Sequence, residues 1–279
     1  MTRILVTGAH GQVGTYLVPM LDGHEVLACS HAQLDISDRT AVEGLVGEFV
    51  PQVVINTAAM TDVDGCETNP ERAYAVNALA VRWIAIAASR VGAHLVQVST
   101  DYVFDGTALE SYREWDTVNP ISVYGKSKLA GEIECAAHAT SWSIARTAWV
   151  YGKPGGDFVS WVLRADAAGD LHGLVDDQAG SPTYAKDLAA VLVQLAARRA
   201  PGVFHVANAG VATRFAQGVA ALEAVGRTTD HVKGMPSSAL PRPAARPAFS
   251  ALADTALAAA GIAPMRPWRD ALVEYCAGL

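Results

Sequence analysis

A tyrosine and a lysine stand four residues apart in the segment Val123-Tyr-Gly-Lys-Ser-Lys128. On a helix, residues i and i+4 share a face. An ammonium group beside a phenol favours the phenolate and lowers the pKa of the tyrosine. Such a phenol can protonate a carbonyl oxygen while a hydride adds to the carbon. Because this spacing also arises by chance on solvated helix faces, it indicates catalysis only when other motifs supply a cofactor and a substrate.

A glycine-rich turn could hold that cofactor. The segment Gly8-Ala-His-Gly11-Gln-Val-Gly14 follows the apolar run at residues 3–7 and opens a helical pattern, as a dinucleotide fingerprint does. Glycines permit a tight turn and close approach to a pyrophosphate, and the helix start presents free N–H groups. A purely structural turn is the alternative. The residues predicted to contact a dinucleotide here are Gly8, His10, Gly11, Gln12, Val13 and Gly14.

The next two expected strands add cofactor contacts at their ends. After the second, residues 25–29, the chain lacks the carboxylate that ordinarily binds the adenosine ribose. NADPH is therefore the predicted cofactor, and acceptance of NADH stays open. Asp35 is expected near the adenine, with helix capping by Ser37 or Asp38 as the local alternative. The predicted contacts are Ser30, Asp35, Ile36, Ala58, Ala59 and Thr61, joined by Tyr124 and Lys128.

Hydroxyl and carboxylate side chains follow the fourth expected strand, residues 94–99. Ligands of open α/β sheets bind outside the carboxyl ends of the strands. We expect Thr100 to hydrogen-bond the substrate oxygen, Tyr124 to protonate it, and Lys128 to hold the cofactor ribose. A turn or helix cap at residues 99–101 is the alternative.

Short apolar runs alternate with helical patterns over the first half of the chain, which predicts a doubly wound parallel sheet of the Rossmann type. Residues 1–150 form the expected NAD(P)-binding domain, to which residues 185–208 return as a helix and a strand. Residues 151–184 and 209–279 form the expected smaller substrate-binding lobe. The Ala-rich tracts near 187–200 and 251–260 are expected to be helical.

Composition narrows the class of protein. The chain has 279 residues, 51% of them hydrophobic, and a net charge of −7, which argues against nucleic-acid or anionic-membrane binding. No secretory signal and no bilayer-spanning run is recognised. The four cysteines lack metal-ligand spacing, and buried thiols in a reducing cytoplasm are expected.

Taken together, these motifs resemble the extended short-chain dehydrogenase/reductases, and more closely the dTDP-4-dehydrorhamnose reductase family. The closer resemblance rests on six segments, in the family's order and spread over nearly the whole chain. They are Ala58-Ala-Met-Thr-Asp-Val-Asp64, Ser99-Thr-Asp-Tyr-Val-Phe-Asp-Gly106, residues 119–132 around Tyr124, Arg146-Thr-Ala-Trp-Val-Tyr151, Asp177-Gln-Ala-Gly-Ser-Pro-Thr183 and Arg246-Pro-Ala-Phe-Ser250.

The resemblance implies reduction of the 4-keto group of dTDP-4-dehydro-L-rhamnose to dTDP-L-rhamnose, with Thr100, Tyr124 and Lys128 as the catalytic set. It also implies that Asp101 and Trp149 contact the sugar and that Arg246 binds the diphosphate. For Trp149, core packing is the alternative. Related dehydratases carry a glutamate after the aspartate as the acid/base at C5, and Tyr102 stands there in this chain.

Several positions depart from the family pattern. The first helix lacks the glutamate that binds magnesium at a dimer contact in some members, so we expect no metal and a monomer or weak homodimer. Phe249 and Asp157 each replace a common asparagine. A ketoreductase for another dTDP-4-keto-6-deoxy sugar therefore stays open. So do a dehydratase or epimerase, and a non-catalytic NADP-binding subunit similar to the regulatory subunit of methionine adenosyltransferase.

Overall fold

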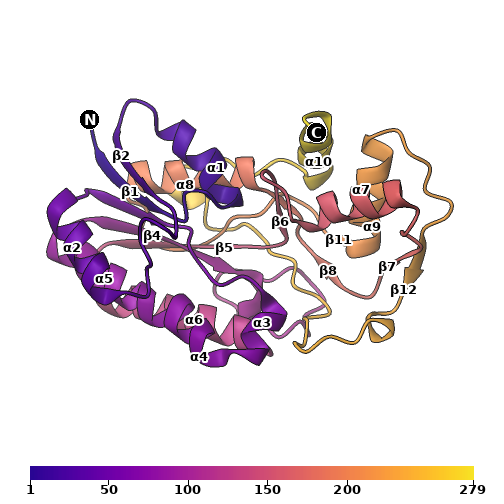
Figure 1. Cartoon of the computed structure of the whole chain (residues 1–279), viewed down its shortest axis with the longest axis horizontal. Helices are drawn as coiled ribbons and strands as arrows, with labels where there is room; N and C mark the ends of the chain where they lie inside the picture. Colours follow the sequence, from indigo (N-terminus) through magenta and orange to yellow (C-terminus); the bar gives the residue numbers. More distant parts are fainter.

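The structure, a computed structural model, describes all 279 residues and is built around a six-stranded parallel sheet (Figure 1). The strand order is β10-β5-β4-β3-β1-β2, and every pair is parallel. The chain order reverses between β1 and β3, so the topological switch point lies at the carboxyl ends of these two strands. The strands are β1 (Arg3–Thr7), β2 (Glu25–Cys29), β3 (Val53–Asn56), β4 (His94–Thr100), β5 (Trp142–Thr147) and β10 (Gly202–His205).

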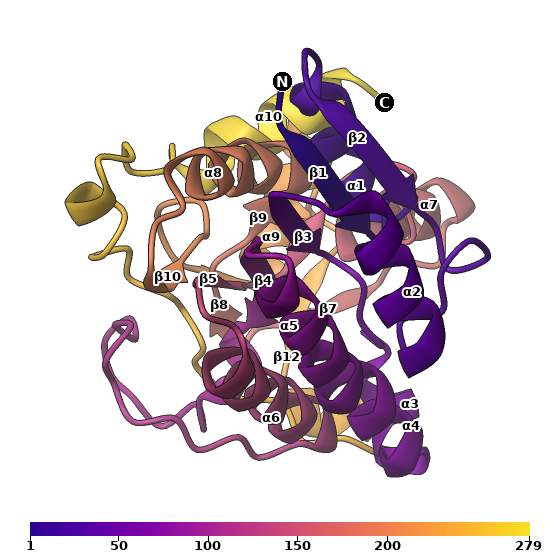
Figure 2. The same ribbon diagram turned by 90° about the vertical axis from the view of Figure 1, so that its left-hand side faces the viewer.

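Helices cover both faces of this sheet, which confirms the doubly wound fold predicted from the sequence. Figure 1 shows α1 and α8 on one side of the strands and α2, α5 and α6 on the other, and Figure 2 shows α5 beside α6. Successive residues of a strand pack against the helices on opposite faces of the sheet. Ile4 packs with α1 and α8, whereas Leu5 packs with α2 and α5. These helices are α1 (Gln12–Leu17), α2 (Arg39–Phe49), α5 (Ala80–Arg90), α6 (Val123–His138) and α8 (Ala185–Arg198).

The helical segment at residues 70–90 is continuous but irregular. It consists of α4 (Pro70–Tyr74), a π-helical turn (Ala75–Leu79) and α5. Within the π turn, the Asn77 side chain bonds the backbone of Met60 and the Ser127 hydroxyl. The irregular turn therefore ties the loop after β3 to the helix that carries Tyr124.

The remaining elements gather beside the carboxyl ends of the strands (Figure 1). They are α7 (Phe158–Ala168), α9 (Arg214–Ala224), α10 (Trp268–Ala277) and the two-stranded pairs β6 (Val150–Tyr151) with β9 (Thr183–Tyr184), β8 (Ala179–Gly180) with β11 (Ala212–Thr213), and β7 (Gly173–Val175) with β12 (Lys233–Met235).

One helix expectation was wrong. The Ala-rich tract near 251–260 forms no α-helix: it contains only a 3-10 turn at Ala258–Ala260. At its start, Ala251 and Ala253 pair with the backbone of Tyr112 instead. This tertiary pairing overrides the helix propensity of alanine.

All four cysteines are buried free thiols. None of the helices is long and apolar enough to cross a membrane.

Candidate active site

The glycine turn after β1 is packed too tightly for any larger residue at two positions. Gly8 has φ +73°, and a Cβ there would lie 2.7 Å from Thr57 Oγ1 and 2.8 Å from the Ala58 nitrogen. A Cβ on Gly14 would lie 2.4 Å from the Gly8 carbonyl oxygen. Gly11 is the N-cap of α1 and offers no side-chain cap. The turn thus brings bare backbone to the carboxyl edge of the sheet, as a pyrophosphate requires.

A cavity of about 800 Å³ runs along this edge, from the end of β2 past β3 to the start of α6. It passes the switch point between β1 and β3, where such sheets bind ligands. Every predicted cofactor and catalytic residue lines it except Gly14, which lies beneath the turn. Those that line it are Gly8, His10, Gly11, Gln12, Val13, Ser30, Asp35, Ile36, Ala58, Ala59, Thr61, Thr100, Tyr124 and Lys128. We call this the first cavity.

The segment after β2 contributes different residues to the first cavity and to the start of α2. Asp35 lines the first cavity and accepts hydrogen bonds from the backbone and hydroxyl of Ser37. Asp38 caps α2 by accepting from the Ala41 N–H. His31, which was not assigned a role from sequence, also lines the cavity at this end.

A chain of hydroxyl and carboxylate groups ends β4. Thr100 Oγ1 donates to Asp101 Oδ1 at 3.0 Å and accepts from the Tyr102 N–H, so Thr100 also caps the short 3-10 turn that follows. The Ser250 hydroxyl donates to Asp101 Oδ2 at 2.6 Å. Burial raises the pKa of Asp101 to about 6, although both hydroxyls favour its ionised form. Asp101 is only 2% exposed but lines the first cavity.

The expected lowering of the Tyr124 pKa is wrong for this structure. Burial raises that pKa, and it outweighs the Thr100 hydroxyl, which favours the phenolate. The negative charge of Asp101 raises it further. Lys128 lies on the same helix face one turn later, yet its Nζ donates to the Val98 carbonyl at 2.8 Å. Burial also lowers the pKa of Lys128 to about 8. In this protein Tyr124 therefore holds its proton firmly at neutral pH.

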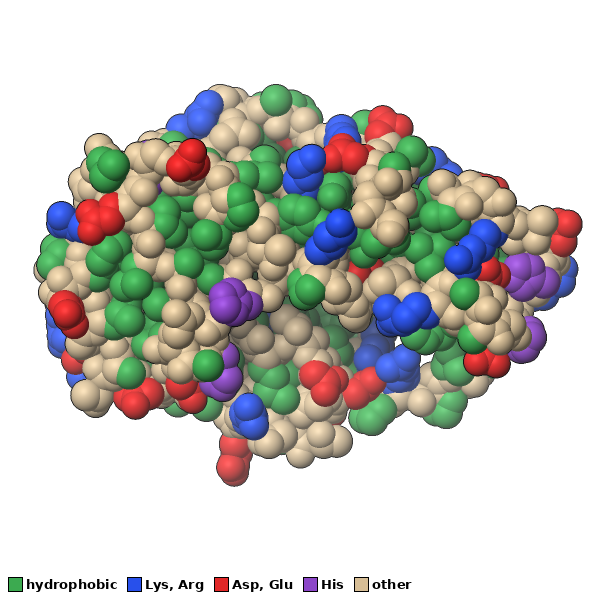
Figure 3. All heavy atoms as spheres, turned by 45° about the horizontal axis from the view of Figure 1, so that its top comes forward, with side chains coloured by type: hydrophobic (Ala, Val, Ile, Leu, Met, Phe, Trp, Pro, Cys, Tyr) green, Lys and Arg blue, Asp and Glu red, His purple; other side chains and the backbone are tan.

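A second cavity, of about 770 Å³, adjoins the first, and residues 156 and 157 line both. Figure 3 shows one face of the molecule hollowed near its centre, with basic side chains along the right-hand border of the hollow. The second cavity is lined by four arginines, Arg164, Arg214, Arg242 and Arg246. Their guanidinium groups suit a phosphorylated or carboxylated ligand.

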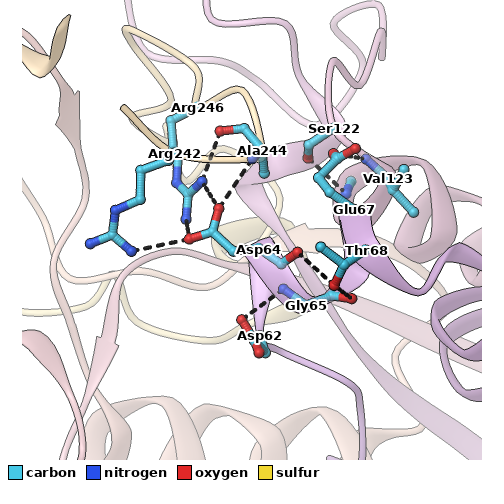
Figure 4. A network of polar contacts seen from close by, with 11 residues as sticks. Asp62, Asp64, Gly65, Glu67, Thr68, Ser122, Val123, Arg242, Ala244 and Arg246 are labelled. Atoms are coloured by element: carbon cyan, nitrogen blue, oxygen red, sulfur yellow. Dashed lines mark hydrogen bonds and ion pairs between the residues drawn. The ribbon is translucent and has the colours of Figure 1, made fainter. Parts of the chain in front are cut away.

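Arg246 lies in this second cavity and is already held by an aspartate (Figure 4). Its NH1 and NH2 groups donate to both oxygens of Asp64, and NH2 lies 2.9 Å from Oδ2. Arg242 NH1 and the Ala244 N–H also donate to this carboxylate. These cationic donors, Arg246 first, hold the pKa of Asp64 well below its usual range. Asp64 thus anchors the loop at residues 242–246 to α3 (Val63–Thr68).

The same short helix contacts the start of the Tyr124 helix. Glu67 Oε1 accepts from the Val123 N–H at 2.7 Å, and Ser122 caps the helix through the Gly125 N–H (Figure 4). One side of α3 therefore holds an arginine of the second cavity, and the other side fixes the first turn of α6.

Trp149 combines both readings that the sequence left open. It lines the first cavity, and its indole also packs so closely on Gly180 that a Cβ there would lie 2.6 Å from Cε2. Trp149 has φ +48°, a strained backbone for a bulky residue. The guanidinium carbon of Arg214 lies 3.5 Å from the centre of the indole ring.

Arg214 is a further cavity residue that sequence reasoning missed. It is the first residue of α9, where the helix dipole disfavours a cation. A lone arginine at a helix start, inside the otherwise apolar run Val211-Ala-Thr-Arg-Phe-Ala216, was the available signal. Without the fold, nothing in the sequence linked it to Trp149.

Comparison with known proteins agrees with this geometry. The family model described as the RmlD substrate binding domain matches residues 1–279. The dTDP-4-dehydrorhamnose reductase of Mycobacterium tuberculosis (strain ATCC 25618 / H37Rv) is 46% identical to this chain. The match covers 99% of this chain and 92% of the relative. The chain belongs to the dTDP-4-dehydrorhamnose reductase family.

Two further relatives bear on the cofactor and on the sugar. The crystal structure of dTDP-4-dehydrorhamnose reductase from Bacillus anthracis str. Ames in complex with NADP matches with a TM-score of 0.96 and 33% identity, over 100% of this chain and 99% of that one. The dTDP-4-keto-6-deoxy-D-glucose reductase of Streptomyces niveus is 36% identical, over 98% of this chain and 96% of its own.

The positions that depart from the reductase family pattern have structural roles here. Phe249 lines neither cavity: it packs with Tyr112 and Leu252, and its backbone bridges Ala179. Asp157 caps α7 and accepts from Gln12 of the glycine turn and from the Tyr275 hydroxyl. Asp157 thus connects the turn with the elements around the second cavity.

Proposed function

We propose that this chain catalyses the NADPH-dependent reduction of the 4-keto group of dTDP-4-dehydro-L-rhamnose, giving dTDP-L-rhamnose for rhamnose biosynthesis. The observation that carries the proposal is that two cavities adjoin, and that Tyr102 of the second packs edge-to-face on Tyr124 of the first. One is a glycine-lined dinucleotide cavity and the other is rich in arginine. Membership of the reductase family supports the same reaction.

The first cavity fits a dinucleotide, because its glycine turn leaves no room for a side chain where a pyrophosphate must approach. When bound, NADPH supplies the hydride. We propose that the glycine turn and the first turn of α1 hold the pyrophosphate, and that Ser30, Asp35 and Ile36 line the adenosine end. Ala58, Ala59 and Thr61 would line the middle, and Lys128 would hold the nicotinamide ribose.

In the proposed reaction, Tyr124 gives its proton to the ketone oxygen as the hydride reaches C4, and the product is a neutral alcohol. The raised tyrosine pKa suits this role, since the donor must be protonated before the reaction and an alkoxide is a stronger base than a phenolate. The Thr100 hydroxyl, which donates to Asp101 in the free protein, would turn to donate to the ketone oxygen and so orient it.

We propose that the sugar lies against Asp101 and Trp149 and that the diphosphate enters the second cavity. Arg246 is fixed there by Asp64, and its orientation is thus set before the ligand arrives. No glutamate follows Asp101, and the side chain at that position is Tyr102, which packs edge-to-face on Tyr124. This arrangement favours simple carbonyl reduction over dehydration.

The proposed division of the chain assigns residues 1–150 and 185–208 to the cofactor domain, and residues 151–184 and 209–279 to the substrate lobe. The pairing of β10 with β5 supports the return of the second segment. We also propose a monomer or weak homodimer in the reducing cytoplasm, which the free cysteines support. Light scattering at increasing protein concentration tests the oligomeric state.

The direct test is oxidation of NADPH by the purified protein with dTDP-4-dehydro-L-rhamnose. We expect one NADPH to be oxidised for each sugar reduced. Absence of turnover, together with tight binding of a partner enzyme, would favour a non-catalytic subunit.

A second candidate is reduction of a different dTDP-4-keto-6-deoxy sugar, which the Streptomyces niveus relative favours. A panel of dTDP-4-keto sugars distinguishes the two, because the preferred substrate should have the highest kcat/KM. A clear preference for a sugar other than dTDP-4-dehydro-L-rhamnose would assign the chain to this second reaction.

A further inference from the structure

Two arginines of the second cavity, Arg164 and Arg214, form no ion pair, and of these Arg164 is exposed whereas Arg214 is partly buried. Arg214 is therefore the partly buried arginine whose charge no acidic group in the protein neutralises by direct contact. Its one protein hydrogen bond runs from NH1 to Gln217 Oε1 at 3.2 Å, and it forms no ion pair. Burial lowers its pKa to about 10, so it stays cationic at neutral pH. Arg246, by contrast, shares Asp64 with Arg242. A partly buried, unpaired cation is unfavourable unless an anion joins it.

The fold holds this guanidinium in one place. Thr213 caps α9 through the Ala216 N–H and also donates to Asp176, which fixes the helix start. The Arg214 guanidinium lies over Trp149 at 3.5 Å from the ring centre and over Phe158 at 4.9 Å. Its planar face is therefore covered by aromatic rings, while most of its N–H donors have no protein acceptor.

Arg214 also lies on the side of the second cavity that faces the reaction centre. Its aromatic partner Trp149 lines the first cavity, and its charge favours the ionised form of Asp101, next to Thr100. Arg246 acts electrostatically on Tyr102 and on Arg214 itself, and its ion pair ties it to α3. Both guanidinium groups line the second cavity, and of the two it is Arg214 that lies against a side chain of the first cavity, Trp149.

We propose that Arg214 binds the phosphate that adjoins the sugar, while Arg246 and Arg242 bind the phosphate that adjoins the nucleoside. This inference rests on the function proposed above. A nucleotide sugar whose C4 reaches Tyr124 must place its sugar-side phosphate nearest the reaction centre. Arg214 presents there the free N–H edge that a phosphate oxygen pair accepts. Its second effect is to hold Trp149 against the sugar.

The test compares dTDP with dTMP, which lacks the phosphate assigned to Arg214. Calorimetric affinities are measured for the NADP-saturated wild type, Arg214→Gln, Arg214→Lys and Arg242→Gln. We expect Arg214→Gln to weaken the binding of dTDP about tenfold or more and the binding of dTMP less than about threefold. Arg214→Lys keeps the charge but loses the planar fork, so an intermediate loss confined to dTDP is expected. Arg242→Gln should weaken the binding of dTDP and of dTMP by the same factor.

The ratio of the two affinities separates a phosphate contact from general damage to the fold, which weakens both ligands alike. The assignment would be overturned if both Arg214 variants lost equal affinity for dTDP and dTMP, or if neither variant lost affinity for dTDP. If wild-type protein reduces the keto sugar while the ratio is unchanged, only this inference fails. If wild-type protein binds neither nucleotide, the proposed function fails with it.

Discussion

The two cavities handle negative charge in opposite ways. The first has Lys128 as its only lysine or arginine, and that side chain is buried and bonded to a carbonyl. Bare backbone at the glycine turn takes the place of further cations. The second cavity carries four arginines that differ in pairing. Arg246 is 16% exposed and Arg242 is 59% exposed, and both pair with Asp64, whereas Arg164 and Arg214 form no ion pair.

This difference indicates how each cavity selects its ligand. Backbone geometry in the first cavity is fixed by packing, so it accepts a ligand only of the right shape. In the second cavity Arg242 and Arg246 belong to a loop, and their arrangement depends on the ion pairs with Asp64. Substitutions should therefore affect the two binding reactions separately. Only the chemical step depends on both cavities, where Tyr102 of the second packs on Tyr124 of the first.

The largest effect is expected at that meeting point. Tyr124→Phe removes the proton donor and leaves the ring, so kcat should fall by about 10²–10⁴-fold. The Kd values for NADPH and dTDP should change little. Steady-state kinetics and calorimetry measure both quantities. Near-normal turnover would exclude Tyr124 as the donor.

Gly8→Ala should damage the first cavity alone. The new Cβ would lie 2.7 Å from Thr57 Oγ1 in a backbone conformation that disfavours alanine. We expect the unfolding free energy to fall by about 2 kcal/mol or more and NADPH binding to weaken strongly, with dTDP binding retained. The matched control is Gly44→Ala in α2, where a Cβ meets nothing within 4 Å. That variant should be stabilised by up to about 1 kcal/mol, and equal behaviour of the two variants would contradict the role of the turn.

Asp64→Asn should affect the second cavity alone. It removes the anchor of Arg246 and of the loop around Ala244. The KM for the nucleotide sugar should rise about tenfold, the Kd for NADPH should stay constant, and the unfolding free energy should fall by about 1–2 kcal/mol.

Glu43→Gln is the matched control for Asp64→Asn, because Glu43 also pairs with two arginines, Arg39 and Arg90, but on the exposed surface of α2. It should leave the stability nearly unchanged and leave the binding of both ligands unaffected, because exposed ion pairs contribute little. An unchanged KM in Asp64→Asn would show that the ion pair does not position Arg246.

The smallest effect concerns pH. Since burial lowers the pKa of Lys128 to about 8, its charge is lost as pH rises through that value. NADPH affinity should then fall by at most about tenfold between about pH 7 and pH 9, and Lys128→Met should abolish this dependence. Affinity for dTDP should stay flat, because the pKa of Arg214 is about 10. If the NADPH affinity of the wild type did not change with pH, this result would argue against a charged lysine at the ribose.

More of the lining of the first cavity than of the second could be predicted from the sequence. The residues of the first cavity follow strands of a parallel sheet, and the carboxyl ends of such strands meet at one edge. The second cavity depends on pairings across long stretches of chain, such as Asp64 with Arg246, which are 182 residues apart. No periodic pattern encodes these pairings. The sign of the Tyr124 pKa shift was likewise missed, because burial of the phenol depends on packing rather than on spacing.

The central claim is that both cavities serve one reaction at C4 of the sugar, beside Tyr124. Its most direct test follows deuterium from NADPH labelled at the transferred position into the sugar, with NMR of the product. The account predicts label at C4, none at C3 or C5, and none at all in Tyr124→Phe over the same time. Oxidation of the cofactor without label at C4, or label transfer that persists in Tyr124→Phe, would contradict it.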